Sequence, residues 1–588
     1  MAALFTTPKR NGKTSGAHFI EPDVRRRTLL AHGSWRRVTR RIVVGAVCAL
    51  TVSSLLMPSV SLAAEWVNVG GTQYNTAAGD EAGTWAWDGA DDMKLNGYNG
   101  GAIEAAGKLN VSYEGNNTVT NDDGRGIKVK DGANENAELN IQGDASSTLN
   151  VTSSRDAITS VGNINIDGAG TVNATSTEHD AIDAGGDVTI KGSGNVNATG
   201  DSDGIRADGN ITIDNSGTVT AKATEDQGID ANENLIIKGG GKVEASSIKD
   251  NAIWADGNIE ISGGSQVKAS SEEDAAIDGK NSLTVTNASL NASGVGHGIY
   301  VYKGITLDGA TVTVRASSDG GEVSALFTDE DDIVIKNGSA VDALAEGRFS
   351  VAISTSNFYS GEAGGHIYIS DSVVKAIARH AETGGDGPDH YSGDQDGEIA
   401  PERRGVNIGI FARTKEGITP ATISIVRSKV TAEGDTAAIF ALAVSADGET
   451  IGTIEIEGAP IQTPTGGKVI GCRNKEELDD GIFYVVGQTI GTGDAVIDSP
   501  YNEAVARSTV IAPPEEIKPE EKPGETKPEG SKSEGTKTTK TVAVAATGAK
   551  IAGKLAATGD ASSAAIVAAA LAGTAAIAAG AVVSRKRS

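Results

Sequence analysis

The feature that most constrains the fold of this chain is an isoleucine that returns about every 24 residues. Its spacings run from 22 to 31 residues, and five of the eight are 24. The repeated residues are Ile103, Ile127, Ile158, Ile182, Ile205, Ile229, Ile253, Ile277 and Ile299. A period of this length indicates a solenoid, in which each repeat packs only against its neighbours.

Two further apolar patterns accompany the isoleucine and divide each repeat into three parts. Ile164-x-Ile166 has counterparts in the following repeats, and so has Val172-x-Ala174. Alternating apolar residues of this kind predict short strands. Three strands per coil predict an all-β chain folded as a right-handed parallel β-helix. A thin stacked core also explains why Gly is frequent, at 76 residues, while aromatic residues are scarce, at 4%.

The repeat pattern also predicts the domain boundaries. We expect the β-helix at residues 99–512, with longer and irregular coils after residue 320 and a long loop at 379–404. Residues 65–98 hold three tryptophans outside the repeat and are predicted to cap the N-terminal edge, because an open strand edge needs protection. Later positions of the first strand are expected at Leu326, Ile353, Ile410 and Ile439.

A column of amide side chains is expected to support the stack, because Asn suits turns and can hydrogen-bond from coil to coil. Its members stand at the second strand of successive repeats, with one aspartate among them: Asn163, Asp187, Asn210, Asn234, Asn258 and Asn281.

The charge and cysteine content exclude two classes of protein. The net charge of −27 excludes a nucleic-acid partner, because neutralising phosphates requires an excess of Lys and Arg. Two cysteines, Cys48 and Cys472, exclude a disulfide-stapled scaffold.

Both ends of the chain are predicted to be targeting segments. Residues 1–64 combine an arginine-rich stretch, an apolar run and then small residues, which is the pattern of a secretory signal peptide. Residues 513–554 are rich in Pro, Glu and Lys and lack apolar residues for a core, so we expect a disordered linker that spans the cell wall. An apolar stretch and the basic Arg585-Lys586-Arg587 follow.

Residues 555–588 resemble the sorting signal of sortase-anchored wall proteins of Gram-positive bacteria. The pentapeptide has alanine where proline is usual, which is similar to actinobacterial signals, and consists of Leu555, Ala556, Ala557, Thr558 and Gly559. The resemblance implies that sortase cuts after Thr558 and joins this residue to peptidoglycan. It therefore implies a secreted protein anchored to the cell wall, with a plain C-terminal membrane anchor as the alternative.

The residue after each repeated isoleucine is expected to point outward, since side chains alternate along a strand. This column mixes acids, an arginine and aromatic rings, which suit the hydroxyls, carboxylates and ring faces of sugars. We therefore predict a carbohydrate-binding face, with a solvated β-surface as the alternative. Its candidate residues are Asp183, Arg206, Asp230, Trp254, Asp278 and Tyr300.

An aspartate precedes many of these strands by two or three residues. Coils stacked about 4.8 Å apart bring such carboxylates together, which raises their pKa or demands cations. Ca²⁺ binds Asp carboxylates and loop carbonyls, whereas Asp is also an ordinary turn former. The sequence thus predicts Ca²⁺ ligands, with turn formation as the alternative, at Asp156, Asp180, Asp203, Asp226, Asp250 and Asp274.

Signals for catalysis are weak, and we expect no enzyme. Gly296-His297-Gly298 is similar to one motif of the polygalacturonases, but the companion acidic motifs are missing from the preceding coils. A polysaccharide lyase would need Ca²⁺ and a basic side chain, for which Arg206 beside the aspartates is the candidate.

The cap segment, the 24-residue coils and the sorting signal together resemble bacterial carbohydrate-binding-domain surface proteins, which are related to calcium-dependent pectin-binding β-helix proteins. The resemblance implies Ca²⁺ as cofactor and an acidic polysaccharide or host glycan as partner. The leading hypothesis is a non-catalytic carbohydrate-binding adhesin on the cell surface. A polysaccharide lyase or hydrolase and a structural stalk without a ligand are the alternatives.

Overall fold

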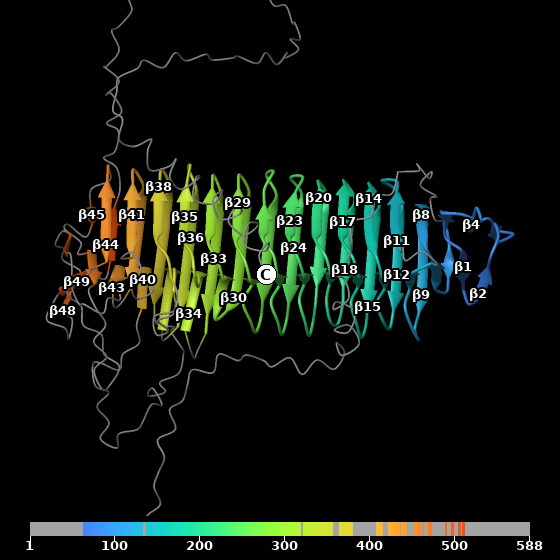
Figure 1. Cartoon of the computed structure of the whole chain (residues 1–588), viewed down its shortest axis with the longest axis horizontal. Coiled ribbons are helices and arrows are strands. Elements are labelled where there is room, and N and C mark those ends of the chain that lie inside the picture. Colours follow the sequence, from blue (N-terminus) through green and yellow to red (C-terminus); the bar gives the residue numbers. More distant parts are fainter. Residues whose placement is uncertain are drawn as a thin grey trace, which may run out of the picture. The chain divides into compact units, whose positions relative to one another are not determined.

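In the computed structural model, short strands stack coil upon coil (Figure 1). The structure describes residues 63–132, 137–318, 322–347, 349–356, 364–379, 407–414, 421–434, 437–443 and 452–458, and short strands between 461 and 511. The signal peptide up to residue 62, the loop at 380–404, the linker and the sorting signal lie outside the described residues. Within the described part, no helix is long and apolar enough to cross a membrane.

Each coil contributes one strand to each of three long sheets, and successive coils pair in parallel. Sheet 1 contains β7 (Ile103–Ala106), β10 (Ile127–Lys130), β13 (Ile158–Ser160), β16 (Ile182–Ala184), β19 (Ile205–Ala207), β22 (Ile229–Ala231), β25 (Ile253–Ala255), β28 (Ile277–Gly279), β31 (His297–Val301), β34 (Glu322–Thr328), β37 (Phe349–Ser354), β40 (Asn407–Thr414), β43 (Ala437–Ala443) and β46 (Val469–Cys472). Sheet 2 contains β5 (Asp92–Asn96), β8 (Lys108–Glu114), β11 (Glu138–Gly143), β14 (Asn163–Gly168), β17 (Val188–Gly192), β20 (Ile211–Asn215), β23 (Leu235–Lys238), β26 (Ile259–Ile261), β29 (Leu283–Thr286), β32 (Ile305–Asp308), β35 (Ile333–Lys336), β38 (Ile367–Ser370), β41 (Thr422–Val426) and β44 (Thr453–Glu457). Sheet 3 contains β6 (Asn99–Gly100), β9 (Asn116–Asn121), β12 (Thr148–Ser153), β15 (Thr171–Ser176), β18 (Asn195–Thr199), β21 (Thr218–Lys222), β24 (Lys242–Ser247), β27 (Gln266–Ser271), β30 (Ser289–Val295), β33 (Thr311–Ser317), β36 (Ala340–Glu346), β39 (Val373–Arg379) and β42 (Lys429–Gly434).

The strand register confirms the repeat predicted from the sequence. Ile158 pairs with Ile182, and Ile182 pairs in turn with Ile205. The positions expected in the later, longer coils are also confirmed, because Leu326 lies between Ile299 and Ile353 in sheet 1. Three stacked parallel sheets agree with a β-helix solenoid.

The core is a set of apolar columns inside the coils. Every repeated isoleucine from Ile103 to Ile299 is fully buried. Burying one such side chain contributes about 1.5–3 kcal/mol, and each column continues through its neighbours. A single coil therefore cannot form a stable core by itself.

Antiparallel strands lie at both edges of the parallel stack. At the N-terminal edge, β1 (Trp66–Val69) pairs antiparallel with β7 and with β2 (Thr72–Tyr74), while β4 (Trp85–Trp87) pairs with β5 and with β3 (Ala78–Gly79). Near the C-terminal edge, β50 (Ser508–Ile511) pairs antiparallel with β42 and with β45 (Ile461–Thr463). The remaining short strands are β47 (Thr489–Ile490), β48 (Val496–Asp498) and β49 (Ala504–Ala506).

The predicted amide column forms a hydrogen-bonded ladder between coils. The main-chain N–H of Asn210 donates to Asp187 Oδ1 at 2.7 Å, and that of Asn234 donates to Asn210 Oδ1 at 3.1 Å. The N–H of Asn258 donates to Asn234 Oδ1 at 2.9 Å. Asn163, Asn210 and Asn234 thus each accept a main-chain N–H at the turn that enters sheet 2. In the next coil Ser282, and not the predicted Asn281, contacts the column by donating its hydroxyl to Asn258 Oδ1 at 2.8 Å.

We predict that Asn234→Ala lowers the free energy of unfolding by about 1–2 kcal/mol, because the N–H of Asn258 loses its acceptor in a partly buried turn. Urea unfolding measures this change. Thr212→Ala, on the outer side of β20, is the control and is expected to change stability by less than about 0.5 kcal/mol. Equal effects of the two substitutions would contradict a supporting role for the ladder.

Candidate functional site

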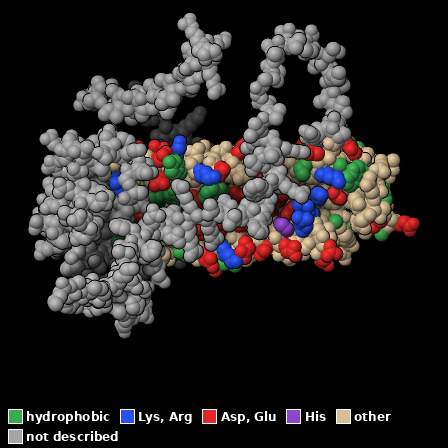
Figure 2. Space-filling model, turned by 60° about the horizontal axis from the view of Figure 1, so that its bottom comes forward, with side chains coloured by type: hydrophobic (Ala, Val, Ile, Leu, Met, Phe, Trp, Pro, Cys, Tyr) green, Lys and Arg blue, Asp and Glu red, His purple; other side chains and the backbone are tan. Residues whose placement is uncertain are grey.

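Acidic and basic side chains lie side by side along the surface of the stack (Figure 2). On sheet 1 this mixture follows the column of residues after the repeated isoleucines. Register places Asp183 between Thr159 and Arg206, and Arg206 between Asp183 and Asp230. Trp254, Asp278 and Tyr300 continue the same column. All six predicted carbohydrate-face residues therefore stand in one row.

Two side chains of this row are less exposed to solvent than a binding face requires. Asp183 and Asp230 are only 8% and 9% exposed, whereas Arg206, Trp254, Asp278 and Tyr300 are partly exposed. Both aspartates stand in the predicted column, but they are buried and offer little surface to a ligand. The physical reason is that the Arg206 side chain lies against both carboxylates.

Arg206 is the electrostatic centre of this region. Its Nη1 lies 3.1 Å from Asp183 Oδ1, its Nη2 lies 2.7 Å from Asp208 Oδ1, and its Nε lies 3.4 Å from Asp230 Oδ2. A fourth carboxylate, Asp203, is 3.9 Å from Nε. Burial alone would lower the pKa of Arg206, but the carboxylates, led by Asp183 and Asp208, raise it above its ordinary value. One cation is therefore shared by four acids.

The predicted column of turn aspartates divides into two sets. Asp156, Asp180 and Asp203 stand two residues before their isoleucine and are buried or partly buried. From the next coil onward the aspartate stands three residues before the isoleucine, and there Asp226 and Asp274 are exposed. The shift by one residue changes the surroundings of the carboxylate.

The second set shows the hydrogen bonds of ordinary turn formers. Asp250 Oδ1 accepts the main-chain N–H of Asn251 at 2.8 Å, and Asp274 Oδ1 accepts that of Ala275 at 2.7 Å. These short-range bonds stabilise the turn before the strand. For Asp250 and Asp274, the turn-forming alternative fits the observed contacts.

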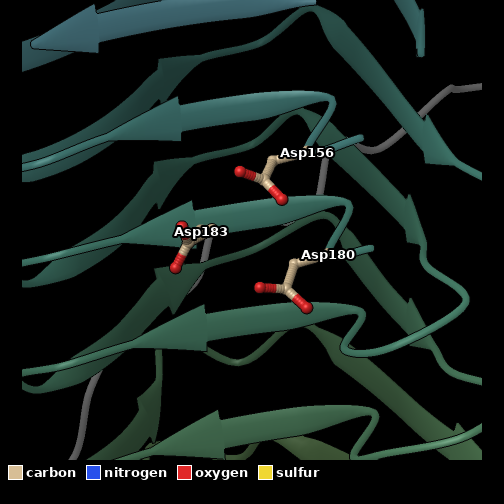
Figure 3. Close-up of side chains that lie close together, drawn as sticks. All are labelled: Asp156, Asp180 and Asp183. Carbon is tan, nitrogen blue, oxygen red and sulfur yellow. The ribbon is translucent and has the colours of Figure 1, made fainter. Parts of the chain in front are cut away.

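The first set and the strand column together form a three-carboxylate cluster. One oxygen each of Asp156, Asp180 and Asp183 lies within 4.8 Å of the others, and Figure 3 shows Asp156 and Asp180 on successive coils with Asp183 beside them. Asp156 Oδ2 accepts a hydrogen bond from Arg125 Nε at 2.6 Å, and Asp183 is paired with Arg206. Two guanidinium groups thus flank the three acids. Because Arg206 also shares its charge with Asp208 and Asp230, the cluster keeps more than one negative charge when all three acids are ionised.

Burial and neighbouring charges raise the pKa of several of these carboxyls. Desolvation and the charge of Asp183 raise the pKa of Asp180 to about 7. Desolvation raises the pKa of Asp230 to about 6 against the opposing effect of Arg206, and desolvation with Asp274 and Asp250 raises that of Asp278 to about 8. The Oδ1 atom of Asp230 is buried and has no hydrogen-bond partner among the described residues.

The donor atoms of the cluster fit a hard divalent cation. All of them are carboxylate oxygens, which Ca²⁺ prefers, and thiolate or imidazole ligands are not part of the cluster. A cation there would favour the ionised form of Asp180, whose pKa is raised by burial and by the charge of Asp183. The residues that would hold it are Asp156, Asp180 and Asp183.

The two aromatic residues of the row, Trp254 and Tyr300, differ in how accessible their rings are to a sugar ligand. Lys280 Nζ lies 5.0 Å from the Trp254 ring centroid, and Trp254 Nε1 donates to Asp256 Oδ1 at 3.1 Å. Tyr300 instead stacks with His297 and Phe327 at centroid distances of 5.5 and 5.3 Å. An exposed lysine is easily displaced, so Trp254 is the better platform for a sugar ring.

The sequence-based prediction missed Arg125 and Asp208. Arg125 stands two residues before Ile127, in the slot that Asp156 and Asp180 occupy in later coils, so extending the column by one coil would have found it. Asp208 stands two residues after Arg206 along the chain, and its contact with the guanidinium follows from that spacing.

Comparisons of this chain with protein-family models, with curated proteins and with solved structures find no match.

We predict that, without divalent cations, the melting temperature is higher near pH 5 than near pH 9. Asp278 has a pKa of about 8 when folded against an ordinary 3.8, so the folded state holds a proton that the unfolded state releases. The stability that this proton contributes is therefore fully present below about pH 4, and it is lost as the pH rises toward 8. Thermal unfolding across this pH range measures the effect.

Asp278→Asn is expected to raise stability at pH 9 by roughly 1–3 kcal/mol and to change it little at pH 5, because the amide carries no charge. Asp214→Asn, which removes a partner of Lys238 on sheet 2, is the control substitution. A melting temperature that rises from pH 5 to pH 9 would overturn the assignment.

Proposed function

We propose that this protein is a non-catalytic, carbohydrate-binding surface protein that uses Ca²⁺ on the outer side of sheet 1. The observation that carries the proposal is the cluster of Asp156, Asp180 and Asp183, whose oxygens lie within 4.8 Å of one another. The raised pKa of Asp180 supports the same conclusion, since a carboxyl that resists ionisation beside another acid is stabilised by a cation.

The charge of the cluster argues for weak Ca²⁺ binding. Arg125 and Arg206 each neutralise part of the negative charge, so a Ca²⁺ ion gains less than it would from three free carboxylates. Extracellular modules bind Ca²⁺ with dissociation constants of about 10⁻⁴–10⁻³ M, and we expect this range.

A bound cation would also reduce the electrostatic repulsion between this acidic chain and an acidic ligand. The chain carries a net charge of −27 and would repel an acidic polysaccharide. Ca²⁺ held by Asp156, Asp180 and Asp183 would attract ligand carboxylates, while Trp254, three coils further along sheet 1, would pack against a sugar ring.

The surroundings of two residues favour a binding protein over a lyase or a hydrolase. Arg206 would have to lose a proton to act as the base of a lyase, but its carboxylate neighbours raise its pKa. Burial lowers the pKa of His297 to about 4, and this ring is stacked with Tyr300 and Phe327. Neither residue has the surroundings of a general acid or base.

We further propose that the protein lies on the surface of a Gram-positive bacterium. Its supports are the signal-peptide pattern of residues 1–64 and the sorting-signal pattern of residues 555–588, through which sortase would join Thr558 to peptidoglycan. The stacked sheets would form a right-handed β-helix, the usual hand of parallel crossovers, carried on the linker at 513–554.

We predict that the secreted chain binds acidic polysaccharides on a glycan array with Ca²⁺ and loses this binding in EDTA. Trp254→Ala should weaken the binding by about 5- to 100-fold, as expected for a central aromatic contact, while Tyr368→Ala, an exposed aromatic residue on sheet 2, serves as the control. Unsaturated or newly reducing products would instead favour the enzyme, and silence in all conditions would favour the stalk.

A further inference from the structure

A hollow of about 200 Å³ opens over the first coils, at the N-terminal part of sheet 1. It lies between β7 and the turns that lead into β10 and β13. This volume leaves room for one small ligand. The polar residues that line it include Glu104, Asn121, Asp123, Arg125, Lys128 and Arg155.

Cations outnumber acids by one in the lining of this hollow, in an otherwise acidic chain. Arg125, Lys128 and Arg155 stand against Glu104 and Asp123 in its lining. Figure 2 shows Lys and Arg side chains gathered over the coils next to the N-terminal edge. The lining carries one net positive charge where the chain as a whole carries −27, although Arg125 shares its charge with Asp156 beside the hollow. This local charge points to an anionic ligand.

The acid in the lining is already neutralised by lysines. Glu104 Oε1 lies 3.3 Å from Lys128 Nζ and 3.2 Å from Lys130 Nζ. Burial would raise the pKa of Glu104, but hydrogen bonds and charges from Lys130 and Lys128 hold it below its ordinary value. Glu104 is therefore an ionised carboxylate held between two cations, which limits its repulsion of an anion.

Both arginines of the hollow, Arg125 and Arg155, have guanidinium N–H groups that could donate to a ligand. Arg125 uses its Nε for Asp156 at 2.6 Å, and the described residues provide no partner for its two Nη groups. Arg155 is exposed, and its side chain makes no ion pair within the described part of the chain. Its position is fixed through the main chain, since its N–H donates to the Gly124 carbonyl at 3.1 Å.

We infer that this hollow is a binding subsite for an oxyanion, meaning a carboxylate, sulfate or phosphate group on a ligand about the size of one sugar ring. The guanidinium groups of Arg125 and Arg155 would donate to the oxyanion, because planar NH donors match its oxygens in pairs. The Asn121 side chain would hydrogen-bond to neutral hydroxyl groups of the ligand. This binding needs no Ca²⁺ and thus goes beyond the proposed function.

Calorimetric titration of the full secreted chain in EDTA at low ionic strength tests the inference. The probes are inorganic phosphate, sulfate and glucuronate, with glucose as the neutral control. We expect saturable one-to-one binding of at least one anion, and the tightest probe identifies the group that is recognised. Because Ca²⁺ is absent, failure here is distinguishable from failure of the Ca²⁺-dependent binding.

Arg155→Ala should weaken the binding of that anion about tenfold or more, since a charge-assisted hydrogen bond is lost. Arg155→Lys should restore part of the affinity, because lysine keeps the charge without the paired donors. Lys268→Ala removes one exposed cation on sheet 3 and should change the affinity less than twofold. Absence of saturable binding, equal binding of glucose, or unchanged affinity in Arg155→Ala would each overturn the inference.

Discussion

In-register parallel pairing between coils is the constraint on which the rest of this structure depends. Each strand pairs with its counterpart one coil away, so like residues stack on like residues at a spacing of about 4.8 Å. For isoleucine this stacking is favourable, because it produces a continuous buried column. For asparagine it is also favourable, since the Asn234 side chain donates to Asn210 Oδ1 and its own Oδ1 accepts the N–H of Asn258. For aspartate it brings like charges together, which costs free energy unless another charge or a proton intervenes.

The aspartate-rich side of sheet 1 shows three ways of relieving this repulsion. Arg206 interrupts the strand column and contacts carboxylates from its own coil and from both neighbouring coils. Arg125 occupies the turn slot next to Asp156 and pairs with it. The raised pKa of Asp180 and Asp278 indicates that bound protons neutralise the carboxylates whose charge the arginines do not compensate. A divalent cation is the remaining option, and it would act where Asp156, Asp180 and Asp183 converge.

The fold was predictable from the sequence because its signal is periodic. The isoleucine positions, the three strands per coil and the amide ladder all follow from residue spacing, and the register confirms them. The candidate site was predictable only in part, because spacing does not describe burial. A shift from two to three residues before the isoleucine moved Asp226 and Asp274 into solvent, and Asp183 became buried beneath Arg206. The hollow near Arg125 lies between β7 and the turns before β10 and β13, and no repeat pattern marks it.

The central claim is that the cluster of Asp156, Asp180 and Asp183 holds a cation, and calorimetric titration with Ca²⁺ at pH 7.5 tests it most directly. The account predicts saturable binding with a dissociation constant of about 10⁻⁴–10⁻³ M. Asp180→Asn should abolish most of this binding while leaving the fold intact or more stable, because an amide keeps an acceptor for the Asp203 N–H and removes a repelling charge. Absence of Ca²⁺ binding by the unchanged chain, or full binding by Asp180→Asn, would contradict the account.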